Sequence, residues 1–191
     1  YENWTTLDDI VVNKRKHKIS LTFDDGYADI YETVYPLCRA KNIPFTIFVT
    51  YGLLNSPGYL TKEQLLELSK DPLVTIGSHD IRHVPLPSIS CDEQNIEITA
   101  SKTMIEELIG KPVKYMRPPH GFRDWAVMEE ASRAGLKVVN WSVIPRDWTN
   151  PGAQEIADRV CKNVKAGAIV LLHDGDAPRQ TASRKQTVEA T

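Results

Sequence analysis

The chain has 191 residues, 41% hydrophobic and 25% charged, with a formal net charge of -2. These values are ordinary for a globular protein, and the length suits one core, so we expect a single domain over residues 1–191. The near-neutral charge argues against nucleic acid as a partner, and no apolar run is long enough for a transmembrane helix.

Six short runs rich in Val, Ile and Phe alternate with longer amphipathic stretches. The runs cover residues 18–24, 45–50, 74–77, 114–117, 137–143 and 168–173. Capping-box patterns predict helices after Thr61 and Ser90, and a last helix from about Ser183 is cut off at Thr191, which predicts a C-terminal truncation. Such alternation is typical of repeated β-α units around a mostly parallel sheet.

Repeated β-α units can form an open doubly wound sheet or a closed barrel. A nucleotide-binding doubly wound fold has a glycine-rich phosphate loop after its first strand, but this chain has Asp24, Asp25 and Gly26 there. We therefore predict an α/β fold, a deformed (β/α) barrel with fewer than eight β-α units. Its active site is expected at the C-terminal ends of the strands.

Two adjacent carboxylates follow the first strand. Within a strand, Asp24 and Asp25 would point to opposite faces, but where the backbone turns away at a barrel rim both side chains can reach one site. One carboxylate is then available to bind a metal ion and the other to accept a proton. The alternative is an Asp-Asp-Gly turn without chemical function.

Two histidines follow the third strand. His79 and His83 are four residues apart, which places both imidazoles on one side of a helical turn or a tight loop. With one aspartate they supply three ligands, the number with which a catalytic zinc site keeps a position open for water. Such spacing alone often arises by chance, but its place on the same rim as the aspartates favours a metal-dependent hydrolase.

Two later strand ends carry further candidates. Arg117 precedes two prolines that fix the backbone, and it is placed to pair with Asp24 and keep it ionised. A surface arginine before a turn is the alternative. His173 ends an apolar run, where an imidazole needs a partner, and the pKa of histidine lies near neutrality, so we expect a general acid.

Five short motifs, in this order, resemble those of the NodB-homology polysaccharide deacetylases, carbohydrate esterase family 4. The motifs are residues 22–26, 79–83, 117–121, 147–148 and 171–173. The first two motifs together are highly specific, whereas the others add weight mainly through their order. The resemblance implies a deformed β/α barrel, which agrees with the fold predicted above from the strand ends.

The resemblance implies a role for each matching residue. The metal ligands would be Asp25, His79 and His83, and the divalent ion would be Zn²⁺ ahead of Co²⁺, Ni²⁺ or Mn²⁺. Asp24 would be the catalytic base, oriented by Arg117, which Asp147 would support. His173 would be the acid that protonates the leaving amine. The residues in contact with substrate would be Trp148, His120, Gly121 and Leu171.

Three positions depart from the family pattern. Asp80 stands where the family usually has a small hydroxyl residue that holds the loop by a hydrogen bond, and His120 stands where it has a tyrosine. Ile144 replaces an aspartate expected three residues before Asp147. None of these departures removes an implied ligand, base or acid, but two of them fall in the part of the site that would contact the sugar.

The implied reaction is metal-dependent removal of N-acetyl groups from an amino-sugar polysaccharide or oligosaccharide, so the expected partner is an N-acetylated glycan. One alternative is a glycan-binding module of the same family with an impaired site. Another is a non-haem iron enzyme, which shares the ligand set of two histidines and a carboxylate but normally has an all-β scaffold. The resemblance also favours an extracytoplasmic or cell-envelope location over a cytoplasmic one.

Overall fold

The computed structural model describes residues 3–13, 18–175 and 183–191. The chain forms two compact units, Tyr1–Val139 and Asn140–Thr191, and each is described by itself. A single domain over the whole chain therefore stays a prediction. No helix among the described residues has the length and apolar character needed to span a membrane.

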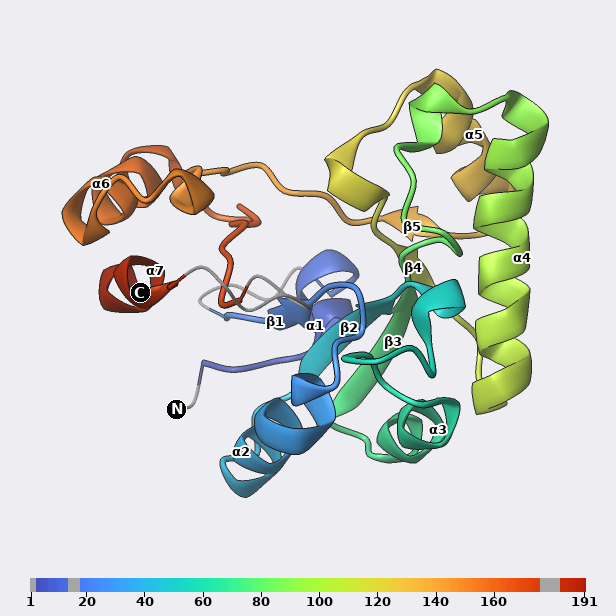
Figure 1. Cartoon of the computed structure of the whole chain (residues 1–191), viewed down its shortest axis with the longest axis horizontal. Coiled ribbons are helices and arrows are strands. Elements are labelled where there is room, and N and C mark those ends of the chain that lie inside the picture. The colour runs from blue at the N-terminus through green and yellow to red at the C-terminus, as the bar shows by residue number, and fades with distance from the viewer. Residues whose placement is uncertain (1–2, 14–17, 176–182) are drawn as a thin grey trace. The chain divides into compact units, whose positions relative to one another are not determined.

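The first unit is built on five parallel strands (Figure 1). They are β1 (Leu21–Phe23), β2 (Phe45–Val49), β3 (Val74–Ser78), β4 (Tyr115–Met116) and β5 (Lys137–Val138). Each strand pairs with the next one in the sequence. Doubly wound sheets reverse their strand order at a switch point, whereas β/α barrels add strands in sequence order. The order observed here is that of a barrel with fewer than eight units.

Helix α1 (Leu7–Val11) precedes β1, and the other helices of this unit connect its strands. The connecting helices are α2 (Tyr35–Ala40, preceded by the π-helical turn Ile30–Val34), α3 (Lys62–Lys70), α4 (Cys91–Ile109) and α5 (Trp125–Arg133). Capping boxes at Thr61 and Ser90 begin α3 and α4, as predicted, and left-handed Gly110 ends α4. The 19-residue α4 packs against β3 and α5, which places its buried face behind the third strand end.

The core of the first unit surrounds the two central strands. All five residues of β2 are buried, and so are four of the five in β3. Strands covered on both faces read as continuous apolar runs, which explains their Val, Ile and Phe content. Because packing holds these strands in place, it also fixes the backbone of the polar residues that follow their C-terminal ends.

The second unit contains α6 (Ala153–Asn163) and α7 (Lys185–Ala190). The strand predicted over residues 168–173 is present only as one parallel bridge between Val143 and Val170, and the strand predicted over residues 137–143 is limited to β5. An apolar run becomes a strand only where neighbours extend the ladder. Among the residues that the structure describes, backbone hydrogen bonds pair residues 169–171 only with residues 142 and 143, so both predicted strands are longer than the observed ones.

Candidate active site

A left-handed turn follows β1 and reorients the two carboxylates. Asp25 has φ 68° and Gly26 has φ 85°, and the Gly26 amide donates to the Asp24 carbonyl at 2.8 Å. Such a conformation costs a non-glycine residue about 1–2 kcal/mol, and Asp tolerates it better than most residues. The turn breaks the alternation of a strand, so that Asp25 faces the histidine loop while Asp24 faces Arg117.

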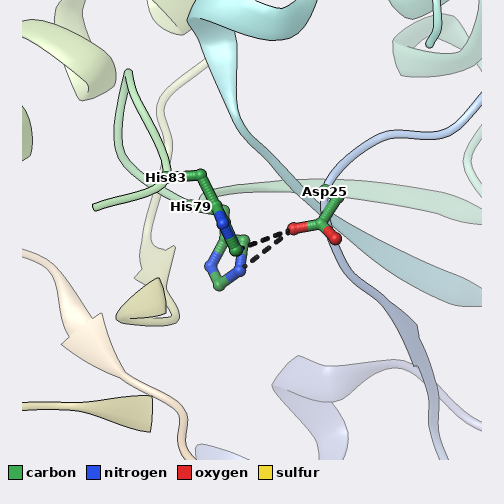
Figure 2. Close-up of side chains that lie close together, drawn as sticks. All are labelled: Asp25, His79 and His83. Carbon is green, nitrogen blue, oxygen red and sulfur yellow. Dashed lines mark ion pairs between the residues drawn. The ribbon is translucent and has the colours of Figure 1, made fainter. Parts of the chain in front are cut away.

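Asp25, His79 and His83 converge from two segments of the first unit, as Figure 2 shows. Asp25 Oδ1 lies 3.4 Å from His79 Nε2 and 3.1 Å from His83 Nε2. Ligands about 2.0–2.2 Å from a tetrahedral ion are themselves about 3.4 Å apart. Among the residues that the structure describes, none gives the buried Oδ1 atom a hydrogen bond of good geometry. The three side chains therefore fit a divalent ion.

The tautomer of His79 also suits a metal ligand. The residue is 1% exposed, and Nδ1 lies 2.5 Å from the Arg117 carbonyl oxygen. Because a carbonyl only accepts, Nδ1 carries the hydrogen and Nε2 keeps its lone pair toward Asp25. Burial lowers the pKa of His79 and outweighs the nearby carboxylates. Neutral imidazole is the form that binds metal. Its Nε2 lone pair and the facing carboxylate oxygen repel each other, and a cation bound between them would remove this repulsion.

The other two members of the cluster influence each other's pKa. Burial alone would raise the pKa of Asp25, but contact with His83 and the charge of both imidazoles lower it below its ordinary value. Burial alone would lower the pKa of His83, but contact with Asp25 raises it. Asp25 is therefore ionised at neutral pH, and its negative charge favours a bound cation.

Asp80 holds the loop between the two histidines. It is fully buried, and its carboxylate accepts hydrogen bonds from the amides of His83 at 2.6 Å and Val84 at 3.3 Å. The Asp80 carboxylate thus makes the hydrogen bond to the loop that a small hydroxyl residue would make at this position. Burial raises the pKa of Asp80 to about 7, which reduces the negative charge that it adds near the cluster at neutral pH.

Arg117 is buried and pairs with Asp24. Its side chain is 1% exposed, and Nη1 donates to Asp24 Oδ1 at 2.7 Å and to Thr22 Oγ1 at 3.1 Å. Nε donates to the Val139 carbonyl at 3.0 Å, and the Phe48 ring lies against the guanidinium. The predicted pairing is present, and the alternative of a surface arginine is wrong. These contacts hold Asp24 Oδ1 against the arginine, so that Oδ2 is the carboxylate oxygen not bound by it.

His120 lies beside the cluster of Asp25, His79 and His83, and Gly121 follows it in the same turn. His120 has φ 56°, and its ring centroid is 4.6 Å from that of His83 and 6.0 Å from that of Phe122. Phe122 is 55% exposed, and Trp125 at the start of α5 is 77% exposed. The Gly121 amide donates to the Pro118 carbonyl at 2.9 Å. A series of rings therefore leads from a predicted ligand toward solvent.

In the second unit, Asp147 is the partner that His173 was expected to need. Asp147 is buried and accepts hydrogen bonds from His173 Nδ1 at 2.9 Å, from the His173 amide at 2.8 Å and from Thr187 Oγ1 at 3.0 Å. The Trp148 ring meets the His173 ring edge-on with centroids 5.2 Å apart, and the Leu171 amide donates to Val143 at 3.0 Å. Support of the arginine by Asp147 stays a prediction.

The hydrogen bonds between buried Asp147 and part-exposed His173 predict a pH-dependent stability. Burial would raise the pKa of Asp147, but the hydrogen bonds from His173 and Thr187 lower it. When the pKa of an aspartate is lower in the folded chain than in the unfolded chain, its ionised form stabilises the fold. This stability is fully present above the unfolded-state pKa near 4, and it is lost as the pH falls through the folded-state pKa. We expect Asp147→Asn to lower the free energy of unfolding by about 1.5–3 kcal/mol at pH 7.

Denaturant unfolding of the full chain at pH 7 and at pH 3 measures this effect. The difference between wild type and Asp147→Asn should shrink at the lower pH. Asp158→Asn, at an exposed carboxylate on α6, is the control and should leave the free energy of unfolding nearly unchanged at both values. An Asp147→Asn deficit that stays constant with pH would contradict the argument.

Two residues of α4 that support the histidine loop were not predicted. Glu97 accepts hydrogen bonds from the amides of Ile81 and Arg82, and Ser101 Oγ donates to the Asp80 carbonyl. Both lie on the buried face of α4, between the apolar residues of its helical repeat. A carboxylate on an otherwise buried helix face is the signal that points to such residues.

Comparison with known proteins places the chain in a family. The sequence model of the polysaccharide deacetylase family matches residues 11–139. The chain is 36% identical over 175 residues to a peptidoglycan-N-acetylglucosamine deacetylase of Bacillus cereus, covering 90% of this chain and 77% of that protein. It is 30% identical over 181 residues to a chitooligosaccharide deacetylase of Sinorhizobium fredii, covering 90% and 81% respectively.

Solved structures show the same fold. The Bc1960 peptidoglycan N-acetylglucosamine deacetylase superposes with a TM-score of 0.69 at 23% identity, covering 90% of this chain and 78% of that one. BA3943, a CE4 family pseudoenzyme from Bacillus anthracis, gives 0.67 at 22% identity, and the match covers 90% of this chain but only 56% of that one. These likenesses confirm the predicted deformed (β/α) barrel. The chain belongs to the NodB-homology polysaccharide deacetylases, carbohydrate esterase family 4.

Proposed function

We propose that this protein is a metal-dependent deacetylase of N-acetylated amino-sugar glycans. The observation that carries the proposal is the cluster of Asp25, His79 and His83, whose ligand atoms lie within 4.8 Å of one another. The ion pair between Asp24 and buried Arg117 in the same unit supports it. The relatives named above act on peptidoglycan and on chitooligosaccharides, both of which carry acetamido sugars.

Asp25, His79 and His83 would hold the ion. Two imidazoles and one carboxylate suit Zn²⁺ and leave a coordination position open, and the same set accepts Co²⁺, Ni²⁺ or Mn²⁺. When bound, a divalent ion polarises the acetamide carbonyl and makes water a stronger acid. The β-α scaffold and the family membership argue against a non-haem iron enzyme.

Asp24 is proposed as the catalytic base. Its Oδ1 atom is held by Arg117, which leaves Oδ2 to accept the proton of the attacking water. The water oxygen adds to the acetamide carbon, and a backbone amide of the 119–121 loop would stabilise the negative oxygen that forms. Pro119 has no amide hydrogen and the Gly121 amide donates to Pro118, so we propose the His120 amide for this contact.

His173 is proposed as the acid. Its Nδ1 is held by Asp147, so the proton for the leaving nitrogen would come from Nε2. Cleavage of the carbon–nitrogen bond then gives acetate and a free amine on the sugar. Trp148, His120, Gly121 and Leu171 remain the proposed substrate contacts, with exposed Phe122 beside His120 as an additional surface on which a sugar ring can stack.

Acetate release tests this function. The full chain, loaded with Zn²⁺, is incubated with a chitooligosaccharide and separately with N-acetylated peptidoglycan, and acetate and free amine are measured. We expect equal amounts of both products, their loss after chelation and their recovery when Zn²⁺ is restored. Full activity after complete metal removal would refute the proposal, whereas glycan binding without acetate would identify an impaired module, as the pseudoenzyme neighbour shows is possible in this fold.

A further inference from the structure

The loop that carries both histidines has an unusual backbone. Asp80 has φ 61° and His83 has φ 56°, a region that residues other than glycine rarely adopt. Such conformations persist only where the surrounding structure holds them in place. The contacts around residues 79–83 therefore decide whether the two Nε2 atoms meet at one point.

The segment after β2 holds the carbonyl side of this loop. The Tyr51 amide donates to the Asp80 carbonyl at 3.1 Å, and the Gly52 amide donates to the Ile81 carbonyl at 3.0 Å. A Cβ atom at position 52 would lie 2.5 Å from the Ile81 oxygen, so this approach requires glycine. These contacts leave the amides of residues 81 and 82 to be paired by another element.

Helix α4 supplies that pairing through one carboxylate. Glu97 is 2% exposed, and its Oε2 atom accepts hydrogen bonds from the amides of Ile81 at 2.9 Å and Arg82 at 3.1 Å. Its Oε1 atom forms an ion pair with Arg82 Nε. Burying a carboxylate is costly unless its oxygens find charged or amide donors, and here both oxygens find them. The carboxylate thus binds the loop at two consecutive residues.

We infer that Glu97 is a positioning residue for the metal site, fixing the backbone between His79 and His83 so that both face Asp25. This inference rests on the proposed function, because it requires an ion at the cluster. Glu97 is neither a proposed ligand nor a proposed substrate contact, and its hydrogen bonds go to Ile81 and Arg82, so its effect would pass through the loop. Residues that orient metal ligands typically change metal affinity 10- to 100-fold when replaced.

The test is the Zn²⁺ affinity of the full chain, measured by competition with a chromophoric chelator. We expect Glu97→Ala to weaken binding about 10- to 100-fold. Glu97→Gln should lose less, because its amide oxygen still accepts from both loop amides. Glu106→Ala is the matched control: Glu106 also lies on α4 and accepts a backbone hydrogen bond, from Val113 at 2.8 Å, away from the histidine loop. Its affinity should equal that of wild type.

Unfolding of the metal-free variants and the visible spectrum of the Co²⁺-loaded protein separate positioning from general stability. Positioning predicts weaker Zn²⁺ binding and an altered Co²⁺ spectrum in variants that are still folded. Wild-type affinity in folded Glu97→Ala, or equal losses in Glu97→Ala and Glu106→Ala, would overturn the inference. If Glu97→Ala does not fold, Glu97→Met decides, because it fills similar space but accepts no hydrogen bond from the Ile81 and Arg82 amides: wild-type affinity and spectrum in that variant refute the role. Failure of the wild type to bind Zn²⁺ would refute the proposed metal site itself.

Discussion

Replacing Asp25 or His79 with alanine is expected to abolish both acetate release and Zn²⁺ retention. Each would supply one of the three proposed ligand atoms, and the remaining two could not hold the ion in a defined geometry. The bound ion is expected to lower the activation barrier by several kcal/mol, so activity should fall by about 10³-fold or more when the ion is lost. Metal content after gel filtration and the rate of acetate release measure the two effects.

Two controls accompany this experiment. Asp92→Ala removes an exposed carboxylate from the first turn of α4 and should leave metal content and activity unchanged. His120→Ala removes an imidazole whose ring touches His83 but which is not one of the three ligands, so Zn²⁺ retention should persist. Full metal content together with full activity in Asp25→Ala would show that the cluster is not the metal site.

Asp24→Asn should separate catalysis from metal binding. Asparagine can still accept the hydrogen bond from Arg117 Nη1, but its amide cannot take the proton of the attacking water. General-base catalysis typically contributes 10²- to 10⁴-fold, so we expect a loss of about that size with Zn²⁺ content near that of wild type. Steady-state acetate release and metal analysis on the same preparation provide the measurement.

The partner of Asp24 gives a contrasting variant. Arg117 is buried, so Arg117→Ala leaves a carboxylate without its charged partner and should also lower the free energy of unfolding, by about 3–5 kcal/mol. Asp24→Asn retains Thr22 and Val139 as partners of the guanidinium and should be less destabilised. If Asp24→Asn released acetate at the wild-type rate, the base would have to be another residue.

Positions after strand ends could be predicted from the sequence because parallel strands bring their carboxyl ends to one edge. The Asp-Asp turn and the histidine pair are therefore predictable neighbours, and so are Arg117 and Asp24. The sequence also indicates that His173 needs a partner. Which residue plays that part, Asp147, depends on contacts between segments distant in the sequence, which local patterns do not determine.

Other features escaped prediction for physical reasons. Glu97 belongs to a helix whose pattern shows only that one face is buried, and its target loop lies 15 residues earlier in the chain. The last predicted strand failed because an apolar run does not reveal whether neighbouring strands exist to pair with it. The sequence also does not predict the left-handed conformations of Asp80 and His120, because neither residue type requires a positive φ.

The left-handed residues near the cluster have a consequence for protein engineering. Glycine at position 80 or 120 would relieve backbone strain by about 1–2 kcal/mol, but it would also remove the contacts that the Asp80 or His120 side chain makes. At Asp80 the two loop amides bound by the carboxylate offset that relief, whereas a library screened only for heat resistance would tend to discard the His120 ring that borders the site. Consensus stabilisation of this chain should keep both positions fixed.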